Sequence, residues 1–404
     1  MRRPLLGPLA ALALSLWMLT ASPSAQSAAD SADALFDGDT LHDLWIHINA
    51  RDWAQLRATY RENTYYPCDV EWRGLKARNA GCRSRGSASR SPAKPGLRVE
   101  FDHYVTGQTF VGLTSLVLDN FWQDPSMMRE RLSMLLFQRM GIPAPREAFT
   151  RLYVGSDRAY AGMYALVEDV DAHFLARQFG DGSGYLYEYQ RQDDYRFEDL
   201  GADLEPYAVR FAPKTHEHES AFTLISPIRD MVRAITEASA SDLETRVAPL
   251  LDLRMVLTQL AVENYLSDWD GVLGDLGLSN FYLYRPPGPG PAQLIPWDKD
   301  NTFSRIDMPP WHNVVTNVLT AKAWAVPELR AFYLQKLAET AASGAWLEKE
   351  AVREYAQIHE AALADRVKSV SNTEFEAAAE DVGRFARERG GIVRRFLAGD
   401  ELRQ

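Results

Sequence analysis

"SNFYLYRPPGPGPAQLIPWDKDNTF", residues 279–303, predicts a β-hairpin that ends in two acids. Residues 280–285 and 293–297 are rich in aromatic and branched apolar side chains, and a loop of proline and glycine joins them, which is the pattern of two antiparallel strands. Asp298 and Asp300 follow the second strand directly. Acids after a strand commonly form a turn, so this stretch alone leaves open whether they bind a metal ion.

A second group of polar residues comes just before the hairpin, in "ENYLSDWDGVLGDLGLSN", residues 263–280. Paired strands bring the two ends of a hairpin together, so we expect Asp270 and Asn280 to lie near Asp298. Carboxylate and amide oxygens suit hard cations such as Mg²⁺ or Mn²⁺. The order Asp, Asn, hairpin, Asp also matches a protein-kinase site, in which the first Asp orients the attacking hydroxyl and the other two residues hold metal. The alternative is that these acids only cap turns.

The N-terminal half contains a loop of small residues in "RSRGSASRSPAKPGLRVEFD", residues 83–102. Backbone amides in such a loop can bind phosphates, and a nearby cation, Lys94 or Arg98, can neutralise them. Surface connections have the same composition, so the loop alone is weak evidence.

The two halves of the chain differ in pattern. Residues 34–168 consist mainly of short alternating segments that predict strands of a mixed sheet. One helix is expected in residues 123–145, with Asp124 as N-cap, Pro125 in the first turn and Gly141 at its end. Residues 169–404 are dominated by amphipathic helices around the hairpin. We therefore expect an α+β fold with a sheet-rich N-terminal lobe and a helical C-terminal lobe.

Residues 1–26 have the pattern of a secretory signal peptide: two arginines, an apolar run and then small residues. No later run approaches the roughly 20 apolar residues of a membrane span, so we expect an exported protein, periplasmic or extracellular, without stable membrane insertion after signal removal. The formal net charge of -11 repels phosphates of nucleic acids and lipids. Binding to nucleic acid is therefore not expected.

The chain has two cysteines, Cys68 and Cys82, on either side of a predicted turn near Gly74. They could lie across a hairpin from each other. In an exported protein a disulfide is the favoured interpretation, and two buried free thiols are the alternative.

The chain resembles the spore-coat CotH kinase-like family, a group of atypical kinases and exported bacterial proteins, from about Leu35 to the C-terminal helices. The segments that carry the resemblance are "RSRGSASR", "KPGLRVEFD", "LVLDNFWQDPSMMRERLSMLLFQRMGIPAPR", residues 152–189, "DWDG", "SNFYLY" and "IPWDKDNTF". The resemblance implies a bilobal atypical protein-kinase-like fold. It also implies an ATP-dependent phosphotransferase that uses Mg²⁺ or Mn²⁺ and acts on a protein or other hydroxyl acceptor.

The resemblance also implies roles for individual residues. Asp270 would match the catalytic-loop acid, Asn280 and Asp298 would match the metal ligands, and Asp300 would support them or cap the turn. The phosphate loop would be formed by Gly86, Ser87 and Ser89. Glu168 falls where the lobes join and the adenine should sit, although a Glu that ends a strand at the surface would look the same.

The phosphate loop departs from the family pattern. Family loops usually have Lys before the glycine and Asn after it, whereas this chain has Arg85 and Ser87. Arg and Lys are not interchangeable as phosphate ligands, so a non-catalytic envelope or surface scaffold with the same fold is an alternative function. A third hypothesis, a hydrolase with paired carboxylates, requires two acids about 5 to 9.5 Å apart across an open groove without a phosphate site.

Overall fold

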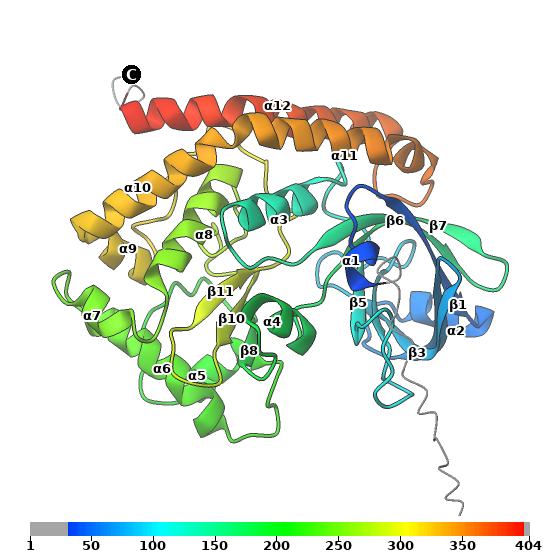
Figure 1. The fold of residues 1–404 in the computed structure, drawn as a ribbon, viewed down its shortest axis with the longest axis horizontal. Coiled ribbons are helices and arrows are strands. Elements are labelled where there is room, and N and C mark those ends of the chain that lie inside the picture. The colour runs from blue at the N-terminus through cyan, green and yellow to red at the C-terminus, as the bar shows by residue number, and fades with distance from the viewer. Residues whose placement is uncertain (1–30, 400–404) are drawn as a thin grey trace, which may run out of the picture.

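The protein was analysed as a computed structural model that describes residues 31–399. The predicted signal peptide, residues 1–26, lies outside the described residues. The expected α+β class is confirmed, because a closed β-barrel forms the first part of the chain and helices around a four-stranded sheet form the second. The two parts lie side by side (Figure 1).

The barrel follows the order β1-β2-β3-β4-β5-β7-β6. β1 and β6 close it with a parallel pairing and the other neighbours are antiparallel, so the predicted mixed sheet is confirmed. Side chains alternate across each strand, and Leu44, Ile46 and Ile48 of β1 point into the barrel core. The strands are β1 (Leu41–Ile48), β2 (Tyr66–Trp72), β3 (Leu75–Arg85), β4 (Gly96–Glu100), β5 (Ser115–Asp119), β6 (Glu147–Val154) and β7 (Ala159–Val167).

Three helices belong to the first part of the chain: α1 (Ala32–Leu35), α2 (Ala50–Ala58) and α3 (Arg129–Arg139). The expected helix is α3, but it begins later than predicted, and its N-cap is Met128. The carboxylate of Asp124 accepts from the backbone N–H of Ser126 at 2.9 Å, which forms a turn that contains Pro125. The same carboxylate still accepts from the first helical N–H, of Arg129, at 2.8 Å.

The predicted hairpin is confirmed as β10 (Phe281–Arg285) and β11 (Gln293–Pro296), with Phe281 opposite Pro296. Two further strands complete this sheet, β8 (Tyr185–Tyr189) and β9 (Phe211–Pro213), in the order β11-β10-β8-β9. The hairpin register places the residue before β10 beside the residue after β11. These two positions are Asn280 and Trp297, and the backbone N–H of Trp297 donates to the carbonyl of Asn280 at 3.2 Å.

Helices enclose this sheet (Figure 1). The buried α8 runs beneath the hairpin, and a bridge between Leu251 and Ala292 separates it from α7. Within residues 31–399, no helix combines the length and apolar character that a membrane crossing needs. The helices are α4 (Ala172–Phe179), α5 (Glu205–Ala208), α6 (Ala221–Glu237), α7 (Leu243–Val247), α8 (Leu253–Leu266), α9 (Val318–Ala325), α10 (Pro327–Ala342), α11 (Gly344–Ala364) and α12 (Asn372–Ala398).

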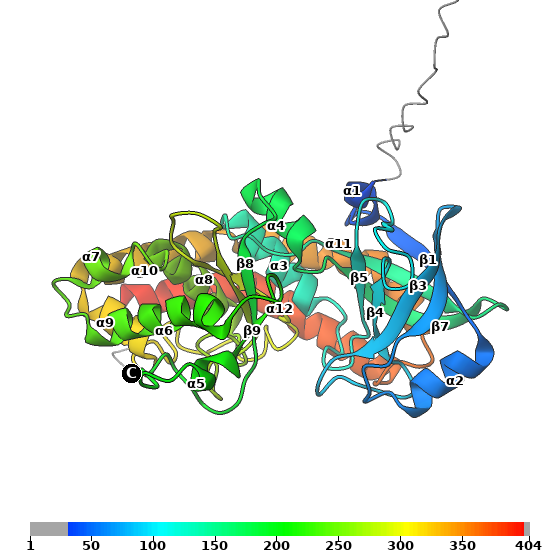
Figure 2. The same ribbon diagram turned by 90° about the horizontal axis from the view of Figure 1, so that it is seen from below.

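Helix α11 connects the two parts of the molecule. It lies beside α12 and extends from the helical part across to the barrel, where it contacts β7 and α3 (Figures 1 and 2). Two buried ion pairs fix this contact: Arg131 of α3 with Glu354, and Lys94 with Asp365 at the end of α11. The barrel itself ends at Val167, next to the predicted division between residues 168 and 169.

The predicted disulfide between Cys68 and Cys82 is wrong for this structure, in which both are buried free thiols. Cys68 lies opposite Ala80 and Cys82 lies opposite Tyr66, so the cysteines are diagonal rather than facing positions of β2 and β3. A hydrogen bond between the two thiols, together with burial, raises the pKa of Cys68. The alternative of two buried thiols is the arrangement found.

Candidate functional site

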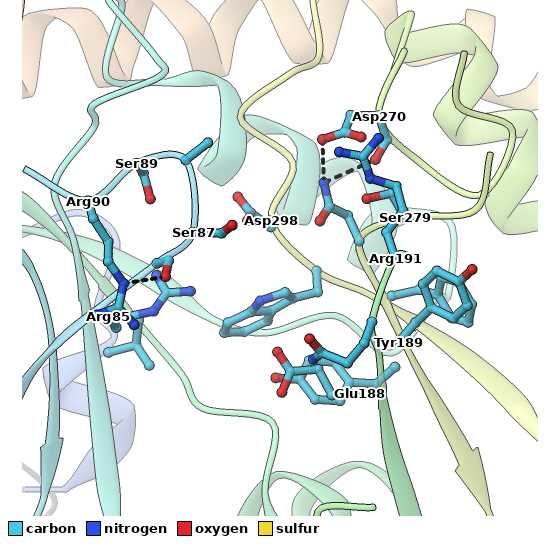
Figure 3. A pocket seen from close by; sticks show the side chains of 18 of the residues that line it. Arg85, Ser87, Ser89, Arg90, Glu188, Tyr189, Arg191, Asp270, Ser279 and Asp298 are labelled. Carbon is cyan, nitrogen blue, oxygen red and sulfur yellow. Dashed lines mark hydrogen bonds between the residues drawn. The ribbon is translucent and has the colours of Figure 1, made fainter. Parts of the chain in front are cut away.

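A cavity of about 470 Å³ lies between the barrel and the hairpin sheet. Its walls come from the end of β3 and the loop after it, from β4, β5, β8 and β10, and from the segment after β11 (Figure 3). Most of the predicted site residues line it. These are Gly86, Ser87, Ser89, Arg98, Asp270, Asn280 and Asp298.

Asp298 follows β11 and lines the cavity, opposite the loop that contains Ser87 (Figure 3). Its φ of 51° lies in the left-handed region, which non-glycine residues seldom adopt outside functional sites and turns. Within residues 31–399, no donor makes a hydrogen bond to its carboxylate. Burial raises the pKa of Asp298 to about 6, Arg85 opposes this rise, and the negative charges of Asp119 and Asp270 add to it. A carboxylate without a hydrogen-bond donor and with a raised pKa is suited to binding a positively charged ligand.

Asp270 and Asn280, which were predicted to lie near Asp298, line the same cavity as Asp298 and are in direct contact with each other. The amide nitrogen of Asn280 donates to the backbone carbonyl of Asp270 at 3.0 Å and to its carboxylate at 3.1 Å. This orientation leaves the amide oxygen of Asn280 unused by Asp270. Burial raises the pKa of Asp270, the charge of Asp268 adds to the rise, and Arg191 lowers it. The hairpin therefore brings a carboxylate and an amide oxygen to one end of the cavity.

A buried ion triad supports this end of the cavity from below. The ammonium group of Lys299 contacts Glu263 at 3.0 Å and Asp268 at 2.9 Å, and all three side chains are almost fully buried. Gly271 is required here, since a Cβ at this position would lie 2.4 Å from the Asp268 carboxylate. Asp268 thus holds the loop in place while Asp270 faces the cavity. The sequence analysis did not identify Lys299, because a lysine between two acids looks like a solvated charge.

Asp300 lies behind the wall of the cavity rather than on it. Its side chain is buried and accepts from the amide of Asn301 at 2.9 Å. Burial, followed by the charges of Asp298 and Asp119, raises the pKa of Asp300 well above the usual value. This position fits the supporting role predicted for Asp300 rather than direct contact with a ligand.

The predicted phosphate loop is held in a fixed conformation. Gly86 has a φ of 105°, and a Cβ there would lie 2.5 Å from the hydroxyl of Ser89. The amide of Asn120 donates to the carbonyls of Ser89 at 3.0 Å and Lys94 at 2.7 Å, which fixes the far end of the loop. Ser87 lines the same cavity as Asp298, and Figure 3 shows its hydroxyl on the side of the loop toward Asp298.

Two predicted ligands do not reach the cavity. Lys94 is fully buried, and its ammonium group donates to Asp365 at 2.7 Å. Glu168 is also buried, where it pairs with Arg146 and Arg177. Both charges are therefore neutralised by ion pairs inside the protein. Arg98 does line the cavity, but it is bound to Glu100 and Asp169.

Arg85 is a cation directly before the loop, and the sequence analysis noted it only as a departure from the family pattern. It ends β3 directly before Gly86 and lines the cavity. Its guanidinium lies 3.4 Å from Asp119 and stacks 5.7 Å from the ring of Trp297. Burial lowers its pKa, but the charges of Asp119, Asp298 and Glu130 outweigh this and leave it raised. Its position directly before Gly86 is the feature of the sequence that could have identified Arg85 as a cavity residue.

The donors at this site fit a divalent cation that also contacts phosphate. Among residues 31–399, no three His, Cys, Asp or Glu side chains are grouped closely enough to hold a metal ion by themselves. Magnesium in nucleotide sites usually takes one or two carboxylates and obtains its other ligands from phosphates and water. The unbonded carboxylate of Asp298 and the free amide oxygen of Asn280 match that requirement.

The family model described as CotH kinase protein matches residues 82–393. This range includes the loop at Gly86, the hairpin and all the cavity residues predicted from the sequence. Inner spore coat protein H of Bacillus subtilis (strain 168) is 26% identical over 374 residues, which cover 89% of this chain and 97% of that protein. The match therefore extends over almost the full length of that relative.

Two solved structures show a distant likeness. One is the complex of HipA, HipB and operator DNA from the Shewanella oneidensis MR-1 toxin-antitoxin system, with TM-score 0.33 and 10% identity over 70% of this chain and 59% of that chain. The other is the Helicobacter pylori proinflammatory kinase CtkA, with TM-score 0.32 and 9% identity over 76% of this chain and 95% of that chain.

Proposed function

The chain belongs to the CotH kinase protein family, and from this premise we propose that it transfers the γ-phosphate of ATP to a hydroxyl group of a protein, with Mg²⁺ or Mn²⁺. The observation that best supports this function is the arrangement of one cavity. Asp270, Asn280 and Asp298 line one side of it, and the loop from Gly86 to Ser89 lines the other. This arrangement suits a triphosphate between the two sides, with the acceptor beside Asp270.

Each residue has a distinct role in this proposal. Asp298 and the amide oxygen of Asn280 would hold the divalent ion, which supplies positive charge to the phosphates when bound. The backbone of the Gly86 loop and the guanidinium of Arg85 would bind the phosphate oxygens. Asp270 would orient the acceptor hydroxyl and take its proton, and Asn280 keeps the Asp270 carboxylate in position.

The test is transfer of labelled γ-phosphate, to the protein itself or to a general acceptor, with Mn²⁺ or Mg²⁺. We expect Asp298→Ala to reduce transfer by roughly 10²-fold or more, because the charge that positions the ion is lost. Asp102→Ala, an exposed acid on the barrel, is the matched control and should transfer as the wild type does. Equal incorporation by wild type and Asp298→Ala would rule out this function.

A non-catalytic scaffold is the second candidate, and one observation favours it. Both cations predicted beside the loop are already engaged, Lys94 by Asp365 and Arg98 by Asp169 and Glu100. Thermal denaturation with ATP and metal separates the two functions, since a ligand that binds the folded state raises its stability by mass action. Absence of any stabilisation at millimolar nucleotide supports the scaffold.

We also propose that the protein acts outside the cytoplasm. The signal-peptide pattern of residues 1–26 supports this location, and so does the name of the Bacillus relative, an inner spore coat protein. Detection of the processed protein in the cytoplasmic fraction alone would contradict it.

A further inference from the structure

Two arginines at the wall of the cavity share one neutral acceptor. The side-chain oxygen of Asn63 accepts from Arg83 at 3.2 Å and from Arg90 at 2.5 Å. All three residues line the same cavity as Asp270, and Figure 3 shows Arg90 and Asp270 on opposite sides of it. Two guanidinium groups are thus held close together by a single amide oxygen.

The other hydrogen bonds of these two arginines are also with neutral oxygens, and the guanidinium of Arg83 lies 5.4 Å from the centre of the Tyr65 ring. Arg83 donates to the hydroxyl of Tyr65 and to its neighbouring carbonyl, that of Ser84, both at 3.0 Å. Arg90 donates to the carbonyls of Gly86, Tyr60 and Glu62 at 2.6, 3.1 and 3.1 Å. These bonds fix the position of the guanidinium groups, but none of them neutralises their charge.

No carboxylate within residues 31–399 forms an ion pair with Arg83 or Arg90. Arg85, by contrast, has Asp119, and the nearby Glu100 is bound to Arg98 and His103. Burial lowers the pKa of Arg90, and the positive charges of Arg83 and Arg85 lower it further. The surplus of positive charge is notable in a chain whose net charge is -11. Such a cluster is stabilised when an anion joins it.

We propose that Arg83, Arg90 and Asn63 form a phosphate-binding subsite beside the loop at Gly86. The planar guanidinium fork matches two phosphate oxygens, and two forks held by neutral acceptors can contact one phosphate from two sides. The phosphate group comes either from the nucleotide or from a phosphorylated acceptor. Only the identity of its source rests on the proposed function, because the subsite itself can be tested with inorganic pyrophosphate.

The sharpest test is Asn63→Asp, which puts a carboxylate where the shared oxygen lies. The new charge should pair with both arginines, so we expect a higher melting temperature in phosphate-free buffer. In calorimetric titration of the full chain with pyrophosphate, without metal, we expect at least tenfold weaker binding than in the wild type. A lower melting temperature, or unchanged pyrophosphate binding, overturns the proposal.

Two further variants complete the experiment. Asn49→Asp makes the same charge change on the barrel at an exposed N-cap, whose side-chain oxygen accepts from the backbone N–H of Arg51 at 2.8 Å, and it should bind pyrophosphate as the wild type does. Arg83→Gln removes one of the two guanidinium groups and keeps a polar side chain. It should lose pyrophosphate binding to a similar extent as Asn63→Asp, and wild-type binding by Arg83→Gln also overturns the proposal.

Titration with ATP and Mg²⁺ identifies the source of the phosphate. Weaker ATP binding by Asn63→Asp assigns the subsite to the nucleotide. If Asn63→Asp binds ATP as the wild type does, but no longer binds pyrophosphate in the presence of a saturating non-hydrolysable ATP analogue, the subsite is assigned to a phosphorylated acceptor. If the wild type binds no nucleotide, the proposed function fails, and the pyrophosphate titration still tests the subsite.

Discussion

Lys299 and Asp298 are adjacent in the chain, but only the charge of Lys299 has direct partners of opposite charge among the described residues. Lys299 is fully buried and bonded to two carboxylates, Glu263 and Asp268, so its charge is balanced within the protein. Asp298 lies at the cavity without a hydrogen bond from the described residues, and burial together with neighbouring acids raises its pKa. The difference separates a charge that is balanced inside the fold from a charge at the cavity that has no direct partner among the described residues.

The same division applies at the loop end of the cavity. Lys94 is balanced internally by Asp365, while Arg83 and Arg90 have only neutral partners. A charged residue near the cavity is therefore not by itself a candidate ligand. What matters is whether its charge is already paired, and substitutions of Lys299 and Asp298 test this rule.

The largest effect is expected from Lys299→Met. This change leaves Glu263 and Asp268 buried without their cation, and breaking a buried ion pair by removing one partner costs roughly 3 to 5 kcal/mol. Urea denaturation of the metal-free protein measures the loss in free energy of unfolding. Lys349→Met, on the solvent side of α11, is the control and should change stability by less than about 0.5 kcal/mol. An unchanged free energy of unfolding in Lys299→Met would mean that the triad of Lys299, Glu263 and Asp268 does not stabilise the fold.

An intermediate effect of opposite sign is expected from Asp298→Asn in the absence of metal. The folded-state pKa of Asp298, about 6, lies above its usual value of 3.8, so the folded protein binds this proton more tightly than the unfolded chain. The stabilisation that this proton gives is present at low pH and is lost as the pH rises through about 4 to 6. Since the carboxyl group borders the cavity and water, we expect about 1 to 2 kcal/mol rather than the full value of the shift.

Unfolding curves at pH 4, 5, 6 and 7 test this prediction. The wild type should lose stability relative to Asp298→Asn between the lowest and highest pH, and saturating Mn²⁺ should reverse the difference at pH 7. Parallel pH profiles for the two proteins would show that Asp298 is not an unbalanced charge.

The sequence predicted the hairpin that forms this site, but it did not predict which residues pair with the charged side chains around it. The hairpin, and the position of Asp270 and Asn280 on the same cavity as Asp298, follow from local strand patterns and from the pairing of adjacent strands, which the sequence contains directly. The partner of Lys94 is Asp365, 271 positions later, and no local pattern connects them. Lys94 and Arg85 lie on the same short segment, so only the three-dimensional packing decides which one reaches the cavity.

The smallest effect is expected from Gly86→Ala, with Gly74→Ala as its matched control. Both glycines have positive φ, 105° and 81°, so alanine is strained at each position and should cost about 1 kcal/mol of stability. They differ in surroundings, because a Cβ at Gly86 would lie 2.5 Å from the Ser89 hydroxyl, while nothing lies within 4 Å of one at Gly74. Only Gly86→Ala should therefore displace the loop beside the unpaired arginines and weaken nucleotide binding, by about tenfold, or roughly 1.4 kcal/mol. Equal nucleotide affinity in the two variants, measured by titration with ATP and Mg²⁺, would show that the conformation of the Gly86 loop does not contribute to nucleotide binding.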